Sequence, residues 1–102
     1  MSDAAELRRA VNRSARAKAI LEDELVVEAL GLIEANLRQA WEHSKFDDVA
    51  GREDAYRMLR TARSFRAWFE QALIDGKVAE AEIERNRQIE RRKAALEGED
   101  EQ

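Results

Sequence analysis

Residues 26–41 read VVEALGLIEANLRQAW, and apolar side chains recur in this stretch at the spacing of an α-helix. The recurring residues are separated by four, three, four and three positions: Val26, Leu30, Ile33, Leu37 and Ala40. Because an α-helix completes a turn in about 3.6 residues, these side chains share one face, which Val27 and Trp41 widen. The stretch therefore predicts an amphipathic helix with one side to bury.

Upstream of this stretch, the same helix is predicted to begin near residue 3 and to run to residue 43. Ser2 or Asp3 can cap its first free N–H groups, and both Asp3 and Glu6 lie where the helix dipole favours acids. Apolar residues are sparser before residue 22, so this half is expected either to dock on a partner chain or to be loosely held. The helix could also bend near Asp23.

Downstream, residues 44–51 combine Ser, two Asp and a Gly between periodic segments and are predicted to form a loop. Asp47 or Asp48 is expected to cap a second helix over residues 48–75, with Gly76 ending it in a left-handed conformation. A short connection between two long amphipathic helices usually returns the chain antiparallel to itself. The stripe from Val26 to Trp41 would then face Phe65, Phe69 and Leu73.

A charged third helix is predicted over residues 78–96, followed by a disordered acidic tail at 98–102. The predicted fold is therefore all-α, one domain over residues 1–97 that consists of a long antiparallel hairpin and a charged C-terminal helix. The chain contains no Pro and 39% charged residues, as long helices do. With 102 residues and only 6% aromatics, one copy has little material for a core, so we expect a homo-oligomer. The residues predicted for the core or the oligomer interface are Val26, Leu30, Ile33, Leu37, Trp41, Phe65, Trp68, Phe69 and Leu73.

Catalytic and metal-binding patterns are missing from the sequence. It has no Cys, and its only histidine, His43, follows a helix where an imidazole commonly meets the last carbonyl groups. The consecutive acids at residues 22–24 point about 100° apart on a helix and cannot converge on one ion. No phosphate-binding loop occurs. We therefore predict no enzymatic activity, no cofactor, no metal and no small-molecule substrate.

No apolar run approaches the roughly 20 residues that a membrane-spanning helix needs, so we expect no membrane partner and a cytoplasmic location.

Positive charge gathers at the beginning of the chain. Residues 1–18 carry five basic side chains against two acids, and residues 19–43 carry six acids against Arg38. The basic residues are Arg8, Arg9, Arg13, Arg16 and Lys18. Arg9, Arg13 and Arg16 share a helix face, so they could contact phosphates or an acidic protein surface. This segment is the predicted site for DNA or another acidic partner.

The segment from residue 17 to residue 77 resembles small helical proteins of tailed bacteriophages, encoded near head and DNA-packaging genes. The resemblance lies in the order of AKAILEDELVVEAL (17–30), ANLRQAWEHS (35–44), DDVAGRE (47–53) and IDGK (74–77). It suggests the functional class of the small terminase subunits, which are short, helical, oligomeric and non-enzymatic. It implies DNA or a virion or packaging protein as partner, in the host cytoplasm or the virion.

Two functions follow from these observations. The first is an oligomerising structural or DNA-packaging accessory protein. The alternative is a small regulatory or inhibitory adaptor that docks an apolar helix face on a host protein.

Overall fold

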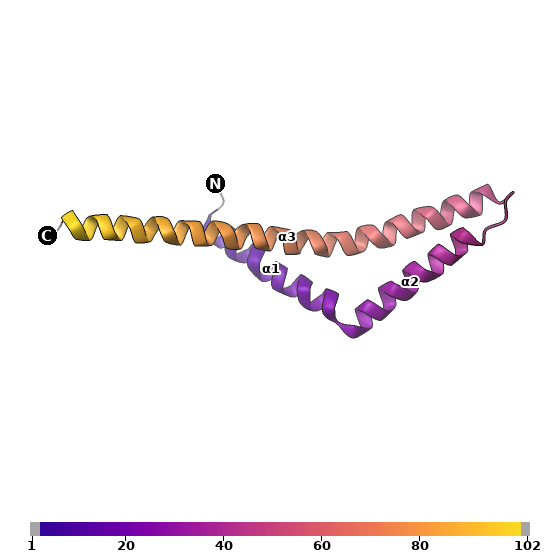
Figure 1. Cartoon of the computed structure of the whole chain (residues 1–102). Helices are drawn as coiled ribbons and strands as arrows, with labels where there is room; N and C mark the ends of the chain where they lie inside the picture. Colours follow the sequence, from indigo (N-terminus) through magenta and orange to yellow (C-terminus); the bar gives the residue numbers. More distant parts are fainter. Residues whose placement is uncertain (1–2, 101–102) are drawn as a thin grey trace.

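Over residues 3–100, the protein is a thin rod of three helices. The structure, a computed structural model, describes residues 3–100 and the side chains of residues 3–98. It contains α1 (Ala4–Glu22), α2 (Glu24–Glu42) and α3 (Val49–Asp100), and no strand occurs in this range (Figure 1). The all-α prediction is thereby confirmed. The rod measures 83 × 26 × 17 Å, so its thinnest direction is less than two helix diameters of about 10 Å.

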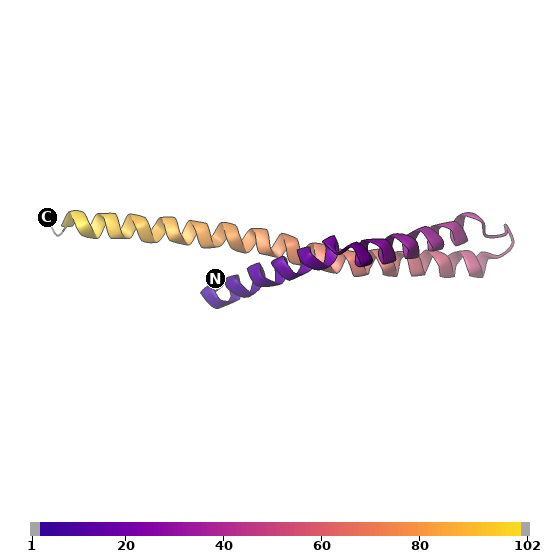
Figure 2. The same ribbon diagram turned by 90° about the horizontal axis from the view of Figure 1, so that it is seen from below.

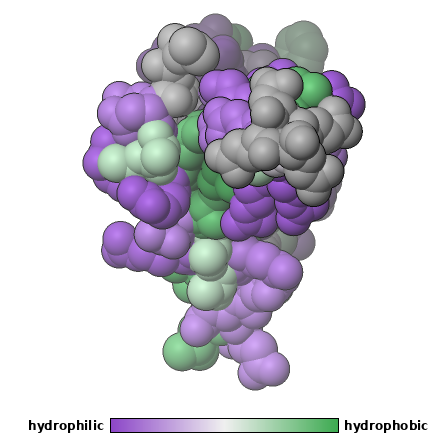
Figure 3. Space-filling model, turned by 90° about the vertical axis from the view of Figure 1, so that its left-hand side faces the viewer, coloured by the Kyte–Doolittle hydropathy of each residue, from purple (hydrophilic) through white to green (hydrophobic). Residues whose placement is uncertain are grey.

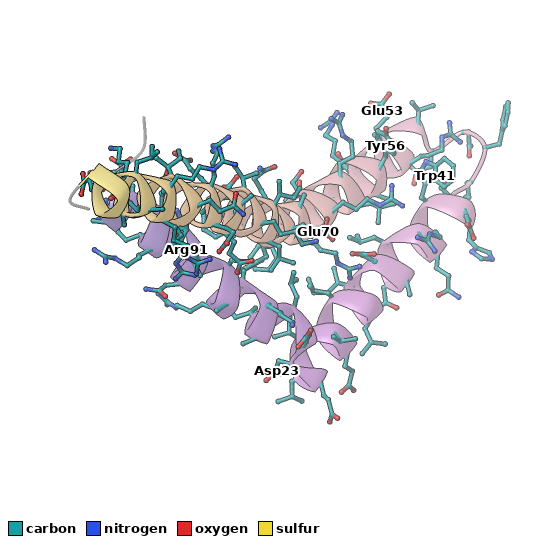
Figure 4. The ribbon with its side chains drawn as sticks, turned by 60° about the vertical axis from the view of Figure 1, so that its left-hand side comes forward. Asp23, Trp41, Glu53, Tyr56, Glu70 and Arg91 are labelled. Atoms are coloured by element: carbon teal, nitrogen blue, oxygen red, sulfur yellow. The ribbon has the colours of Figure 1, made fainter. Side chains whose placement is uncertain are left out.

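The long helix α3 is the spine against which the other two helices lie. α1 and α2 form a V with its vertex at Asp23 (Figures 1 and 4). The chain reverses direction in residues 43–48, and α3 then runs back past α2 and α1 (Figures 1 and 2). The end of α3 extends beyond the start of α1.

The predicted helix over residues 3–43 is two helices, so that boundary is wrong, although the break falls at the anticipated bend. Asp23 has an extended backbone, with φ −62° and ψ 126°. Its carboxylate accepts the N–H groups of Leu25 at 2.9 Å and Val26 at 3.3 Å, and so caps α2. Because a short Asp side chain can satisfy the backbone itself, it competes with continuous helical hydrogen bonding.

The predicted caps at the starts of α1 and α3 are confirmed. The Asp3 carboxylate accepts the N–H of Glu6 at 2.8 Å at the start of α1. Asp48 accepts the N–H of Gly51 at 3.0 Å at the start of α3. At the end of α2, the Nδ1 atom of His43 lies 3.0 Å from the Gln39 carbonyl oxygen, as expected for a histidine beside the last turn.

The predicted end of a helix at Gly76 is wrong, because α3 continues through it without interruption. No glycine in the described range has a positive φ. Gly76 is buried instead, at a point where an added Cβ would overlap the side chain of Ser14 in α1. The helices predicted at 48–75 and 78–96 are therefore one. The predicted disordered tail is helical over 98–100, and residues 101–102 lie outside the described range.

The core is a narrow seam between α3 and the other two helices. Among residues 3–98, seven apolar residues are buried, of which four are alanines: Leu7, Ala17, Leu30, Ala55, Leu59, Ala72 and Ala79. Small side chains allow helix axes to approach closely but bury little apolar area per residue. The seam positions the helices without enclosing the aromatic side chains of the described residues.

Replacement of Gly76 by alanine tests the close contact between α1 and α3. Alanine favours a helix by about 1 kcal/mol over glycine, but overlap with Ser14 should outweigh this gain and lower stability by about 1–3 kcal/mol. Gly31→Ala in α2 is the matched control: an added Cβ there meets nothing within 4 Å, so this variant should be more stable. Urea unfolding followed by circular dichroism measures both. Stabilisation by both substitutions would contradict the close contact.

Candidate interaction surfaces

The nine predicted core or interface residues differ widely in exposure. One is buried, Leu30. Four are half-buried: Val26, Leu37, Phe69 and Leu73. Four are exposed: Ile33, Trp41, Phe65 and Trp68. The exposed four include both tryptophans, so the bulkiest side chains of the chain remain in contact with water.

An open apolar groove of about 450 Å³ lies between α2 and α3. Its walls are Leu30, Ile33 and Leu37 from α2, and Met58, Thr61, Ala62 and Phe65 from α3. Met58 is 58% exposed and Phe65 is 56% exposed, although both border the groove. Figure 3, which looks along the rod from the end that holds the C-terminus, shows apolar surface between two hydrophilic flanks at the opposite end of the rod from this groove. The predicted contact of Phe65 with the α2 stripe is thus present but only partly covered.

One ion pair joins α2 to α3 within the described residues. The Nη2 atom of Arg66 lies 3.0 Å from Oε1 of Glu34, and the Glu34 side chain is only 17% exposed. This oxygen makes no hydrogen bond, so the pair is a charge contact whose angle is unfavourable for donation. The ion pair and the groove lie on opposite sides of the seam between α2 and α3. On the side of the ion pair, Arg66 and Glu70 line a separate hollow with Val27.

Trp68 and Phe69 of α3 lie beside α1. Trp68 and Phe69 line a hollow of about 160 Å³ with Arg13, Arg16 and Ile20. The Arg13 guanidinium carbon lies 5.4 Å from the centroid of the Trp68 ring, within range of a cation–π interaction. The prediction that Phe69 faces the α2 stripe is therefore wrong, because the V shape of α1 and α2 brings α1 to this part of α3.

The five predicted basic residues are all exposed on α1: Arg8, Arg9, Arg13, Arg16 and Lys18. None of them forms an ion pair with any side chain of residues 3–98. Because α1 is helical throughout this segment, Arg9, Arg13 and Arg16 do share one face. Their charge is therefore available to an external anion.

Sequence reasoning missed two basic residues that the fold brings beside Arg8. Arg87 and Arg91 of α3 line an open hollow of about 490 Å³ with Leu7 and Arg8 of α1. Arg91 lies on the side of α3 that faces α1 (Figure 4). Glu84 lies 3.7 Å from Arg87 and offsets part of this charge. No signal in the sequence could pair residues about 80 positions apart.

Chemical features of other kinds are limited in the described range. No group of three or more acidic or histidine side chains could hold a metal ion among residues 3–98. The acids at residues 22–24 end one helix and start the next, and Asp23 acts as a cap. Within the described chain, none of the three helices contains an apolar stretch long enough to cross a bilayer.

Comparison with known proteins gives no relative. No family model matches the chain, and neither a curated protein nor a solved structure matches it. The arguments about function therefore rest on the surfaces described above.

A double-mutant cycle tests the ion pair between α2 and α3. Glu34→Gln, Arg66→Gln and the double variant should give a coupling free energy of about 0.5–1 kcal/mol in urea unfolding, since Glu34 is largely shielded from water. The pair of Glu53 and Arg57 is the control, because both side chains are more than 60% exposed and the atoms lie 3.6 Å apart. Its coupling should be smaller. Equal couplings would show that shielding contributes nothing.

Proposed function

We propose that this protein is a non-enzymatic, self-associating helical protein that serves as a structural or DNA-packaging accessory, in the manner of small terminase subunits. In this proposal the antiparallel hairpin of α2 and α3 is the unit that associates. The basic face of α1 holds DNA or an acidic virion protein, in the host cytoplasm or the virion. The uncovered apolar groove between α2 and α3 is the observation that carries the proposal.

The accessible surface supports self-association. The chain exposes 8,496 Å², whereas a folded monomer of 11.7 kDa exposes about 5,900 Å². The difference of about 2,600 Å² exceeds the roughly 800 Å² that each partner buries in a standard interface. An elongated shape accounts for part of it, but Ile33, Phe65 and Trp68 are each 47–61% exposed. Covering such side chains is favourable by about 25 cal/mol per Å² of apolar area.

The charges of α1 support an anionic partner. Its five basic residues have no ion-pair partner within residues 3–98, and the fold adds Arg87 and Arg91 beside Arg8. A row of arginines on a helix can meet successive phosphates and release counterions on binding. A net charge of −4 is compatible with this role when the positive groups are concentrated at one end.

Mass in solution tests self-association directly. Light scattering coupled to size exclusion, at low and moderate salt, should give a mass of at least twice the 11.7 kDa of one chain. The apolar part of the interface should keep the assembly together at moderate salt, because salt screens only exposed charges. A folded monomer at micromolar concentration would refute self-association.

DNA binding is tested with a variant in which two arginines of α1 are replaced by uncharged glutamines. The double variant Arg8→Gln, Arg9→Gln should bind duplex DNA more weakly and lower the slope of log K against log salt by up to about 1.8, or about 0.9 for each phosphate contact. Arg60→Gln, Arg63→Gln in α3 removes the same charge elsewhere and should change little. Titration by fluorescence anisotropy measures both, and absence of binding by the unmodified chain at low salt would remove DNA as the partner.

The second candidate function is an adaptor that docks on a host protein. Trp68 favours it, because this side chain is 61% exposed beside the hollow lined by Arg13 and Arg16. Large exposed aromatic residues next to arginines are typical of the centre of protein interfaces. A folded monomer in the mass measurement would leave the adaptor as the function to pursue.

A further inference from the structure

The groove between α2 and α3 carries an inference about what fills it. Seven residues line it and none of them is charged, which is unusual on a chain with 39% charged residues. We propose that its occupant is the same groove of a second copy, related by a two-fold axis that passes α3 between Thr61 and Ala62. This inference rests on the proposed self-association and specifies its geometry.

The spacing of residues along α3 supports the position of the axis. Met58 and Phe65 lie equally far from the point between Thr61 and Ala62, at about 5 Å along the helix. A two-fold axis there would bring Met58 of one copy against Phe65 of the other, twice. Both side chains line the groove, and both are more than half exposed when the chain is considered alone. A thioether against an aromatic ring is a favourable contact that adapts well to irregular gaps.

Charge supports the same axis. Asp54, Thr61 and Trp68 are seven residues apart, so they lie on one side of α3 at successive intervals of about two turns. The axis therefore places Asp54 of one copy opposite Phe69 of the other, one position along the helix from Trp68. Arg13 lies 5.4 Å from the Trp68 ring, so the carboxylate would approach an arginine that lacks an ion-pair partner among residues 3–98. Isologous interfaces repeat each such pair twice.

Asp54 can form this pair without leaving its neighbour unpaired. Its contact with Arg57 is 3.6 Å long and exposed, and Glu53 contacts the same guanidinium at 3.6 Å. If Asp54 turns toward the second copy, Arg57 keeps Glu53. Asp54 would thus exchange one weak surface contact for another at the edge of an apolar interface. The main effect of the new contact is to set the register of the two copies.

The exposed surface of the whole chain is large compared with the area that a stable dimer buries. Each copy exposes about 2,600 Å² more than a typical folded chain of its mass, and each partner of an obligate dimer buries about 1,000–2,500 Å². One rod is 17 Å thick in its thinnest direction. Along the paired grooves, two rods would form an arrangement of four helices and would therefore be thicker.

A cysteine at the axis tests this geometry, since the natural chain contains no Cys. In the Thr61→Cys variant, the two thiols would lie close together across the axis and should form a covalent dimer under mild oxidation. The control is Arg63→Cys: this exposed residue is two positions further along the helix and lies outside the groove lining. It should crosslink at least about tenfold more slowly.

The outcomes separate this geometry from self-association in general. Fast crosslinking at residue 61 alone, with a natural chain of twice the single-chain mass, supports the two-fold axis. If the natural chain self-associates but Thr61→Cys crosslinks no faster than Arg63→Cys, the geometry is overturned and self-association stands. If the natural chain is monomeric, both are overturned.

A charge exchange provides a second test that does not depend on crosslinking. Arg13→Asp and Asp54→Arg should each weaken the dimer about tenfold, measured by sedimentation over a dilution series. The two together should restore the dissociation constant to within about threefold, because the opposite charges again face each other across the axis. Losses that simply add in the combined variant would overturn the pairing of Asp54 with Arg13.

Discussion

The packing of α1 and α2 against one side of a single long helix is the constraint on which the other features depend. Because the rod is 17 Å thick in its thinnest direction, the chain covers α3 along one side only, and few of its side chains are buried. The covered side holds small residues and the close contact of Gly76 with Ser14. The large side chains remain on the flanks, where they can be buried only by another molecule.

The local features of the fold could be predicted from the sequence, because they depend on neighbours within a few residues. The caps at Asp3 and Asp48 and the position of His43 beside Gln39 are of this kind. Gly76 could not be predicted. Its sequence context is typical of a helix end, and only the approach of Ser14, 62 positions earlier, explains why a glycine lies inside a helix. Tertiary contact here outweighs local preference.

The same distinction applies to the candidate surfaces. The shared face of Arg9, Arg13 and Arg16 followed from their spacing along the predicted helix. The position of Trp68 beside Arg13, and of Arg91 beside Arg8, depends on how α1 crosses α3, which periodicity within each helix does not determine. Residues on one face of a helix can be read from the sequence, but the helix that this face meets cannot.

The stretch of α3 beyond Arg91 has a mechanical consequence. Residues 92–98 are all exposed and lie past the start of α1, yet they remain helical. A separate peptide of this length would not stay helical in water, because it would have to nucleate a helix by itself. Here the packed part of α3 supplies the nucleus, and each further residue only extends it. The stretch therefore projects from the packed part of α3 as a stiff helix that rises about 1.5 Å per residue, rather than as a flexible chain.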